Sequence, residues 1–161
     1  MKRKFFPFLI ITLAVILFGS CRKSNGVING NGQFPFSFQQ VGGWSGLNEN
    51  LKISTTSTYY SISYNDLNTG KAKNYETTIR TPDELWNNLT KTFDLGTFIQ
   101  IKDGDCRSCV DGTDEIFSYT NLGKTYSVYN GDADKNFQQM QDFFNLMYEQ
   151  INNFRTLAGV Q

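Results

Sequence analysis

The sequence contains no histidine, and this absence removes whole classes of chemistry. Without an imidazole there is no Ser-His-Asp or Cys-His nucleophile pair, no histidine ligand for zinc and no histidine pH switch. Most hydrolase mechanisms are therefore excluded. The spacing of the remaining acidic, hydroxyl and amine side chains singles out no catalytic residue, no metal ligands and no cofactor site.

An excess of one charge is also lacking, because 15 basic residues face 15 acidic ones. No run of Lys and Arg extends beyond the first residues, so the chain lacks a basic patch and we expect no nucleic-acid partner. There is no G-x-G-x-x-G motif and no β-α-β alternation, which argues against a nucleotide-binding parallel sheet. The 161 residues are 15% aromatic, which supplies enough apolar surface for one folded domain.

The N-terminus has the pattern of an export signal. Lys2, Arg3 and Lys4 are followed by a mainly apolar run, 5–18, and by the small residues Gly19 and Ser20. This run is shorter than the roughly 20 residues that a membrane-spanning helix needs. Residues 1–20 are therefore interpreted as a cleaved signal peptide.

The run Phe18-Gly19-Ser20-Cys21 resembles the lipobox of bacterial lipoproteins, with Phe18 where Leu is commoner. The resemblance implies that the Cys21 thiol is diacylated and anchors the protein in a membrane, each buried methylene contributing about 0.8 kcal/mol. It places the protein in the bacterial cell envelope. No acidic run follows Cys21, which favours a periplasm-facing position. The alternative is an ordinary secretory signal with an incidental cysteine.

A flexible tether is predicted for residues 21–33, which are rich in Gly and Asn, and a single folded domain for residues 34–161. Phe34, Phe36 and Phe38 alternate with polar residues as in a strand, although Pro35 predicts that this strand begins at an edge of the sheet. Turns are expected at 68–70 and 121–123. The further segments with strand character are Leu51–Ser54, Thr58–Tyr64, Asn74–Arg80, Thr97–Ile101, Glu115–Tyr119 and Thr125–Tyr129.

Two helices are predicted among these strands. Thr81, Pro82 and Glu84 form a capping-box pattern at the start of the first helix. The second is expected over 134–154, where large apolar residues recur at intervals of three and four. The order of elements predicts an α+β fold, with an antiparallel sheet of about six strands and both helices packed on one face.

Cys106 and Cys109 form the most conspicuous motif, Cys-x-x-Cys, in an acidic, turn-rich stretch. In an exported protein whose Cys21 carries lipid, these two thiols are expected to form a disulfide that closes a small loop. Thiol exchange is the alternative, although nearby carboxylates raise a thiol pKa and disfavour the thiolate. One Cys-x-x-Cys supplies too few ligands for structural zinc.

The same stretch contains Asp103, Asp105, Asp111, Asp114 and Glu115. Their spacing fails the EF-hand pattern, because Ser108 stands where the glycine is needed and Asp114 where the bidentate Glu is needed. An irregular calcium site remains an alternative. The carboxylates are interpreted as solvated turn residues.

The run Gly42-Gly43-Trp44-Ser45-Gly46 predicts a tight turn in which Trp44 caps the core. The alternative makes Gly42, Gly43, Trp44 and Gly46 a binding loop, because Trp is enriched at binding hot spots. Over these five residues the chain is similar to emfourin-type inhibitors of bacterial metalloproteases, which open with Gly-Gly-Phe-x-Gly, but no inhibitory residue is carried over. With the elements that follow, it also resembles small envelope lipoproteins of uncharacterised function.

Two classes of function follow from the sequence. The first, which we favour, is a lipid-anchored, non-catalytic module that binds or inhibits a protein or binds a glycan through its sheet face or glycine-rich loop. The second is a thiol-redox or metal-dependent activity at the Cys106 and Cys109 loop. The tyrosines Tyr59, Tyr60, Tyr64 and Tyr75 are interpreted as sheet surface and not as a platform for sugar stacking.

Overall fold

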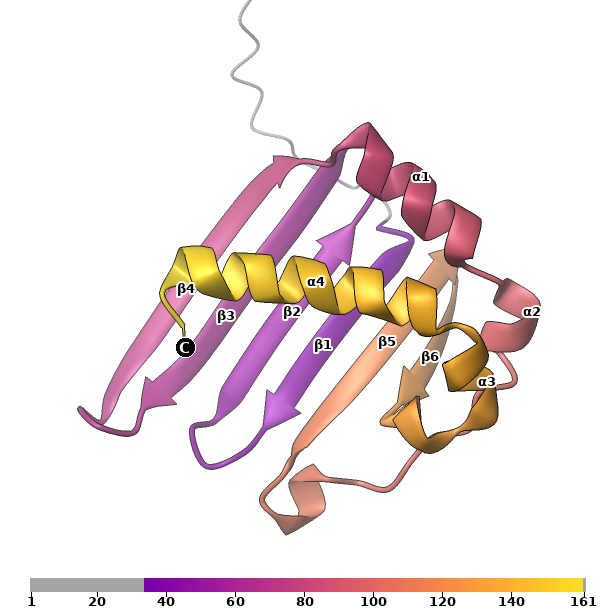
Figure 1. The fold of residues 1–161 in the computed structure, drawn as a ribbon. Helices are drawn as coiled ribbons and strands as arrows, with labels where there is room; N and C mark the ends of the chain where they lie inside the picture. Colours follow the sequence, from indigo (N-terminus) through magenta and orange to yellow (C-terminus); the bar gives the residue numbers. More distant parts are fainter. Residues whose placement is uncertain (1–33, 161) are drawn as a thin grey trace, which may run out of the picture. The chain divides into compact units, whose positions relative to one another are not determined.

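The computed structural model describes residues 34–160, which form a six-stranded sheet with helices on one face (Figure 1). The predicted signal peptide, Cys21 and the tether lie outside the described residues. Within 34–160, no helix combines the length and the apolar character that crossing a bilayer requires. In chain order the elements are β1 (Phe36–Gly42), β2 (Leu47–Ile53), β3 (Ser57–Asp66), β4 (Lys71–Arg80), α1 (Asp83–Thr92), α2 (Leu95–Phe98), β5 (Thr113–Asn121), β6 (Lys124–Tyr129), α3 (Lys135–Gln139) and α4 (Gln141–Ala158).

The sheet has the strand order β4-β3-β2-β1-β5-β6, and every neighbouring pair is antiparallel. The first four strands follow one another as a meander. The chain then passes through α1 and α2 and returns as β5 on the other side of β1. The predicted α+β fold, with an antiparallel sheet and both principal helices on one face, is confirmed (Figure 1).

Alternation along the strands separates a buried face from an open face. On β1, Phe36 and Phe38 are buried beneath the helices while Ser37 and Gln39, between them, point to the other side. The same alternation makes Tyr60 a fully buried core residue, and Tyr64 and Tyr75 pack half-buried against the core, so the interpretation of these three as sheet surface was wrong.

The long helix α4 covers the centre of the sheet through aromatic contacts. Its residue Phe154 stacks on Tyr60 of β3 at a ring-centroid distance of 4.9 Å, and Phe144 meets Phe117 of β5 edge to face at 4.7 Å. Fully burying a large apolar side chain stabilises a fold by about 1.5–3 kcal/mol. Contacts at both ends of α4 therefore tie the two halves of the sheet together.

The strand that follows Pro35 lies inside the sheet and not at an edge, contrary to the prediction. β1 begins at Phe36, one residue after the proline, and pairs with both β2 and β5. The missing N–H of Pro35 thus falls outside the ladder, and its carbonyl accepts a hydrogen bond from Thr120 N at 2.8 Å.

The strand predicted for Thr97–Ile101 is also wrong. Most of the segment belongs to the short helix α2 or directly follows it, and the side chain of Asp94 accepts a hydrogen bond from Thr97 N at 2.6 Å. This N-cap contact outweighs the strand character of the β-branched residues. Phe98 is buried from this helix.

The predicted capping box does not form at the start of α1. The helix begins at Asp83, and no side chain caps it. Thr81 is fully buried instead, and its hydroxyl lies 2.9 Å from the hydroxyl of Thr58 on β3. The Thr81 hydroxyl therefore connects the segment before α1 to β3 and does not cap the helix.

The predicted second helix is broken at Met140 into α3 and α4. The break brings Phe137 and Phe144 into a parallel stack at a centroid distance of 3.7 Å. Residues seven apart in an unbroken helix would be separated by roughly 10 Å along its axis. The apolar spacing predicted one helix because it continues through Met140 without a signal for the break.

Both predicted turns are confirmed. Gly70 closes the β3–β4 turn with φ 65°, and Gly123 closes the β5–β6 turn with φ 78°. Leu122, which precedes Gly123, also has a positive φ of 48°.

Candidate functional site

Three loops lie at the same end of the sheet, which we call the loop end: the β1–β2 turn (43–46), the β3–β4 turn (67–70) and the loop before β5 (102–112) (Figure 1). Gly43 N donates to the carbonyl of Gly112 at 2.9 Å, and Asn65 N donates to the carbonyl of Ser45 at 2.7 Å. The glycine-rich turn therefore contacts the loop before β5 and the last residues of β3. The first of these contacts brings together the glycine-rich turn and the Cys-x-x-Cys motif, which lie more than fifty residues apart in sequence.

Gly42 shows why this turn requires glycine. It adopts φ 110°, and a Cβ at this position would lie 2.9 Å from the carbonyl oxygen of Gly112 and 3.0 Å from Cβ of Ser108. Such an approach is too close for any side chain. The turn can therefore pack closely against the loop before β5 (102–112), which we call the cysteine loop, only because Gly42 has no side chain.

Large apolar side chains project from all three loops. Trp44 is 80% exposed, Leu67 is 73% exposed and Val110 is 79% exposed. The prediction that Trp44 caps the core is therefore wrong. Exposed apolar residues on neighbouring loops are a feature of interaction surfaces, and Trp is enriched at binding hot spots.

The cysteine loop is held in a fixed shape. The Sγ atoms of Cys106 and Cys109 are 1.98 Å apart, as in a disulfide, and a single 3₁₀ turn (Ser108–Val110) follows Arg107. Asp114, at the start of β5, accepts hydrogen bonds from Arg107 N at 2.8 Å, from Ser108 N at 3.3 Å and from the Ser108 hydroxyl. The carboxylate thus anchors the loop to the sheet.

These contacts also set the electrostatics of the loop. Hydrogen bonds from Ser108, from Asn130 and from backbone N–H groups lower the pKa of Asp114 to about 2. Cys106 Sγ lies 3.9 Å from this carboxylate. A negative charge this close disfavours a thiolate, so the geometry does not favour thiol exchange at this loop.

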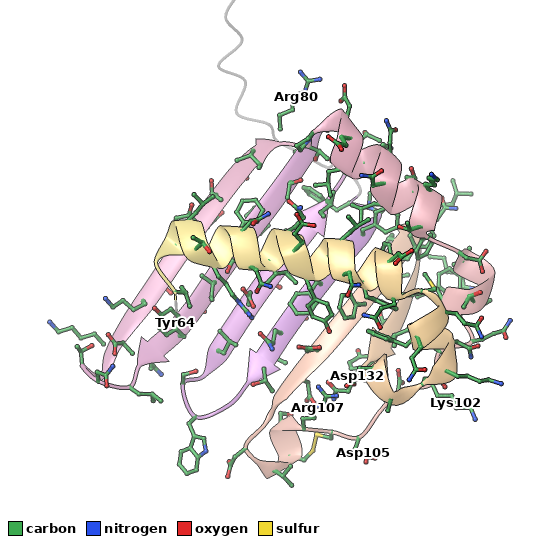
Figure 2. All side chains as sticks on the ribbon, in the orientation of Figure 1. Tyr64, Arg80, Lys102, Asp105, Arg107 and Asp132 are labelled. Atoms are coloured by element: carbon green, nitrogen blue, oxygen red, sulfur yellow. A yellow bond between two sulfur atoms is a disulfide. The ribbon has the colours of Figure 1, made fainter. Side chains whose placement is uncertain are left out.

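Two further carboxylates, Asp103 of the loop and Asp132 after β6, bond to neighbouring groups. Asp103 accepts a hydrogen bond from Tyr129 N at 2.8 Å, and Arg107 forms an ion pair with Asp132 (Figure 2). Across residues 34–160, no group of three or more carboxylate or thiol side chains is arranged to hold a metal ion.

The interpretation of the acidic residues in this stretch as solvated turn residues was wrong for Asp114 and Glu115. Both lie on β5, where Asp114 accepts hydrogen bonds from the loop and Glu115 accepts them from Gln40 and Tyr148.

Sequence reasoning missed Asn130, the residue that joins the cysteine loop to the sheet. Its side-chain amide donates to the carbonyl of Asp105 and to Asp114, both at 2.7 Å, and its side-chain carbonyl accepts from Glu115 N at 2.8 Å. Asn130 is buried and adopts φ 48°. Asn tolerates this conformation better than most residues, so the Asn130-Gly131 pair was the available signal.

A second polar cluster, which the sequence analysis also missed, lies under α4. Glu49 of β2 is fully buried, and its carboxylate accepts hydrogen bonds from the hydroxyl of Tyr60 at 2.6 Å and from Arg155 Nε at 2.9 Å. Arg155 also donates to Gln40 at 2.6 Å. The available signal was the position of Glu49 on the inward side of a strand otherwise lined by Leu and Ile.

Tyr148 of α4 joins this cluster, because Glu115 accepts hydrogen bonds from both Tyr148 and Gln40, and neither Tyr60 nor Tyr148 is poised to act as a base. Burial and a hydrogen bond to Glu49 raise the pKa of Tyr60 above its usual value, and burial and a hydrogen bond to Glu115 do the same for the pKa of Tyr148. Within the described residues no buried side-chain nitrogen or oxygen lacks a hydrogen-bond partner. The cluster therefore holds α4 on the sheet, and the loop end is the better candidate for function.

No protein-family model matches this chain, and no curated protein matches it in sequence.

Proposed function

We propose that this chain is a lipid-anchored binding or inhibitor module of the bacterial cell envelope, which docks on a partner protein through Trp44 at the loop end. The observation that carries this proposal is the exposure of Trp44, Leu67 and Val110 on three neighbouring loops. The lipobox at Cys21 supports the anchor.

The loop end has the rigidity expected of a preformed docking surface. The Trp44 turn is bonded to Gly112, and the loop on the other side of this contact is closed by a disulfide and pinned by Asp114. A surface that is ordered before binding loses little conformational entropy when the partner arrives. Trp44 therefore lies on a turn that is already ordered before a partner binds.

The charges at the loop end favour a protein over a bilayer as the partner. Asp66 precedes Leu67 and Asp111 follows Val110, so carboxylates adjoin both aliphatic residues. Anionic headgroups would repel these carboxylates. We therefore expect a partner surface with an apolar pocket for Trp44 and basic groups around it.

Affinity capture from envelope extract, with the full chain as bait, tests the docking surface. The Trp44→Ala variant is compared with the wild type and with Leu122→Ala, which removes an equally prominent side chain, 93% exposed, from the β5–β6 turn. A partner recovered by the wild type is then purified and titrated directly. We expect Trp44→Ala to weaken this binding at least about 30-fold, as at a hot spot of about 2 kcal/mol or more, and Leu122→Ala to leave it unchanged. Equal binding by all three proteins overturns the docking surface.

The anchor is tested separately. Mass spectrometry of the protein from membranes should find a diacylated Cys21 as its first residue, and Cys21→Ser should release the protein into the soluble fraction. An intact segment 1–20, or an unmodified Cys21, overturns the anchor. Insulin reduction distinguishes the alternative activity, because a binding module should not catalyse it and a redox protein should.

A further inference from the structure

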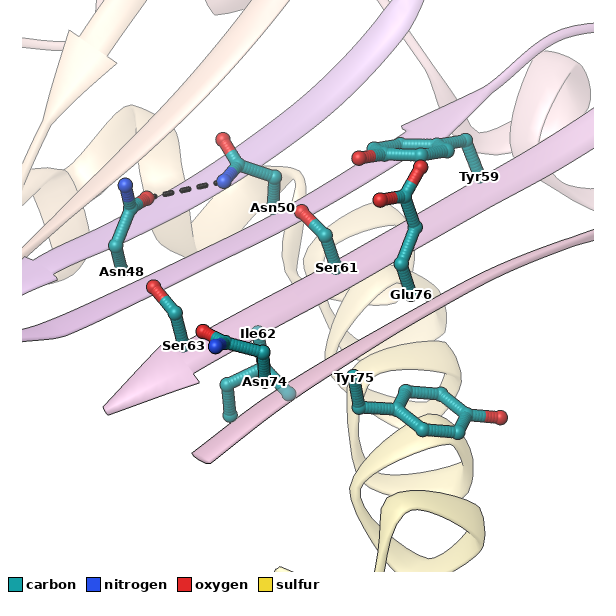
Figure 3. Close-up of a pocket in the computed structure, with 9 residues that line it drawn as sticks. All are labelled: Asn48, Asn50, Tyr59, Ser61, Ile62, Ser63, Asn74, Tyr75 and Glu76. Atoms are coloured by element: carbon teal, nitrogen blue, oxygen red, sulfur yellow. Dashed lines mark hydrogen bonds between the residues drawn. The ribbon is translucent and has the colours of Figure 1, made fainter. Parts of the chain in front are cut away.

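The face of the sheet opposite the helices carries a hollow of about 410 Å³ over β2, β3 and β4 (Figure 3). We propose that this hollow, which we call the trough, binds a neutral oligosaccharide. The site differs from the loop end and takes a different class of ligand, so it goes beyond the docking function proposed above.

The shape of the trough follows from the strand register. Ser61 and Ser63 of the central strand β3 point to the open face, because Tyr60 and Ile62 beside them are buried. Each serine lies between longer side chains on β2 and β4, so the short residues form a floor and the long ones form two walls. These cross-strand triplets are Asn50, Ser61 and Glu76, and Asn48, Ser63 and Asn74.

The polar groups of the trough are free to bind a ligand. Among residues 34–160, the side chains of Ser61, Ser63 and Asn74 make no hydrogen bond, and Asn50 bonds only to Asn48, at 3.0 Å (Figure 3). Hydroxyl and amide groups both donate and accept, as sugar hydroxyls do.

The other half of the same face is different. Over β5 and β6, the hydroxyls of Ser118 and Ser127 lie 2.9 Å apart, and so do those of Thr120 and Thr125. These hydroxyls form hydrogen bonds with one another across the two strands. Fewer hydroxyls are therefore free over β5 and β6 than over β2, β3 and β4.

Two features of the trough favour an uncharged sugar: its balanced charges and the tyrosine at one of its ends. Of the side chains that line it, Glu76 is the one acidic group, and Lys52 lies beside the trough with its Nζ 5.7 Å from the centroid of the Tyr59 ring. One negative and one positive charge give no net attraction for a charged polymer. Tyr59 faces the open side at one end of the trough (Figure 3), where its ring offers an apolar surface for stacking against a sugar ring. This is a role for Tyr59 that the sequence analysis did not favour.

Titration of the full chain in detergent tests this site. The probes are cellohexaose, chitohexaose, maltohexaose and mannohexaose, with a heparin hexasaccharide as the charged comparison, and binding is followed by calorimetry and by NMR shifts of backbone amides. We expect at least one neutral probe to bind and to shift the amides of Ser61 and Ser63. Because the ligand carries no charge, its affinity should not change between low and high salt.

Matched variants locate the binding. Ser61→Tyr fills the trough and should weaken binding at least about tenfold, whereas Ser127→Tyr makes the same change on the same face outside the trough and should have no effect. Tyr59→Ala should weaken binding up to about tenfold, and Trp44→Ala should leave it unchanged. Thermal unfolding checks that each variant is folded. Failure of all four neutral probes, binding of heparin alone, or equal affinity of the Ser61→Tyr and Ser127→Tyr proteins overturns the proposal.

Discussion

Arg155, in the last turn of α4, donates from Nε to the fully buried carboxylate of Glu49 on β2 at a distance of 2.9 Å. The pair joins residues 106 positions apart in the chain. Because the Arg155 side chain is only 32% exposed and Glu49 is fully buried, loss of the arginine would strand a negative charge in the core.

We expect Arg155→Met to lower the free energy of unfolding by about 2–4 kcal/mol, measured by urea denaturation. The control is Arg80→Met, since Arg80 pairs with Asp83 on the surface and both side chains are at least 80% exposed. This change should cost no more than about 0.5 kcal/mol. Equal losses in the two variants would contradict a structural role for the buried pair.

Phe144 should be among the costliest core positions to truncate. It is fully buried and contacts Phe117 and Phe137. Phe144→Ala should lower the free energy of unfolding by about 3–5 kcal/mol. Leu157→Ala, an exposed position on the same helix, should change it by less than about 0.5 kcal/mol. A similar midpoint of denaturation for both variants would show that α4 is not packed as described.

Substitution of two turn glycines separates backbone strain from steric contact. Gly70 adopts φ 65°, and no atom lies within 4 Å of the position that a Cβ would take, so Gly70→Ala should cost about 1–2 kcal/mol through the backbone alone. Gly42→Ala adds a collision with the Gly112 carbonyl and should cost clearly more. It should also speed hydrogen exchange of the Gly43 amide. If the two variants are equally stable, the β1–β2 turn does not pack on the cysteine loop.

The loop end should lose stability progressively between about pH 4 and pH 2. The pKa of Asp114 is lowered from 3.8 to about 2 in the folded protein, so its contribution to stability is complete above about pH 4 and is lost as the pH falls toward 2. Carboxyl ¹³C shifts should report this titration directly. Asp114→Asn should be less stable than the wild type at pH 7 and should lose less stability between pH 4 and 2. A normal pKa for Asp114 would contradict its role in holding Arg107 and Ser108.

The sequence predicted the fold class because strand alternation and helical spacing are local signals. The hairpin turns at Gly70 and Gly123 were predicted for the same reason. The break at Met140 and the helix at 95–98 were not, since each depends on a specific contact, the Phe137–Phe144 stack in one case and the Asp94 cap in the other.

The candidate site could be predicted only in parts. The Trp44 turn and the cysteine pair were both recognised from their residues, but their contact through Gly43 and Gly112 depends on β1 pairing with β5, which no local pattern reveals. The trough likewise depends on which strands are neighbours. The burial of Glu49 could be understood only once Arg155 was placed beside it.

The position of α4 at the end of the described chain has a consequence for the order of folding. All six strands precede α4 in the sequence, and the apolar face of the sheet depends on Phe144 and Phe154 of this helix for its cover. A chain that emerges from its N-terminus onward cannot complete its core until α4 is free. Folding of the domain should therefore wait for this helix, and truncation before residue 141 should leave an aggregation-prone sheet.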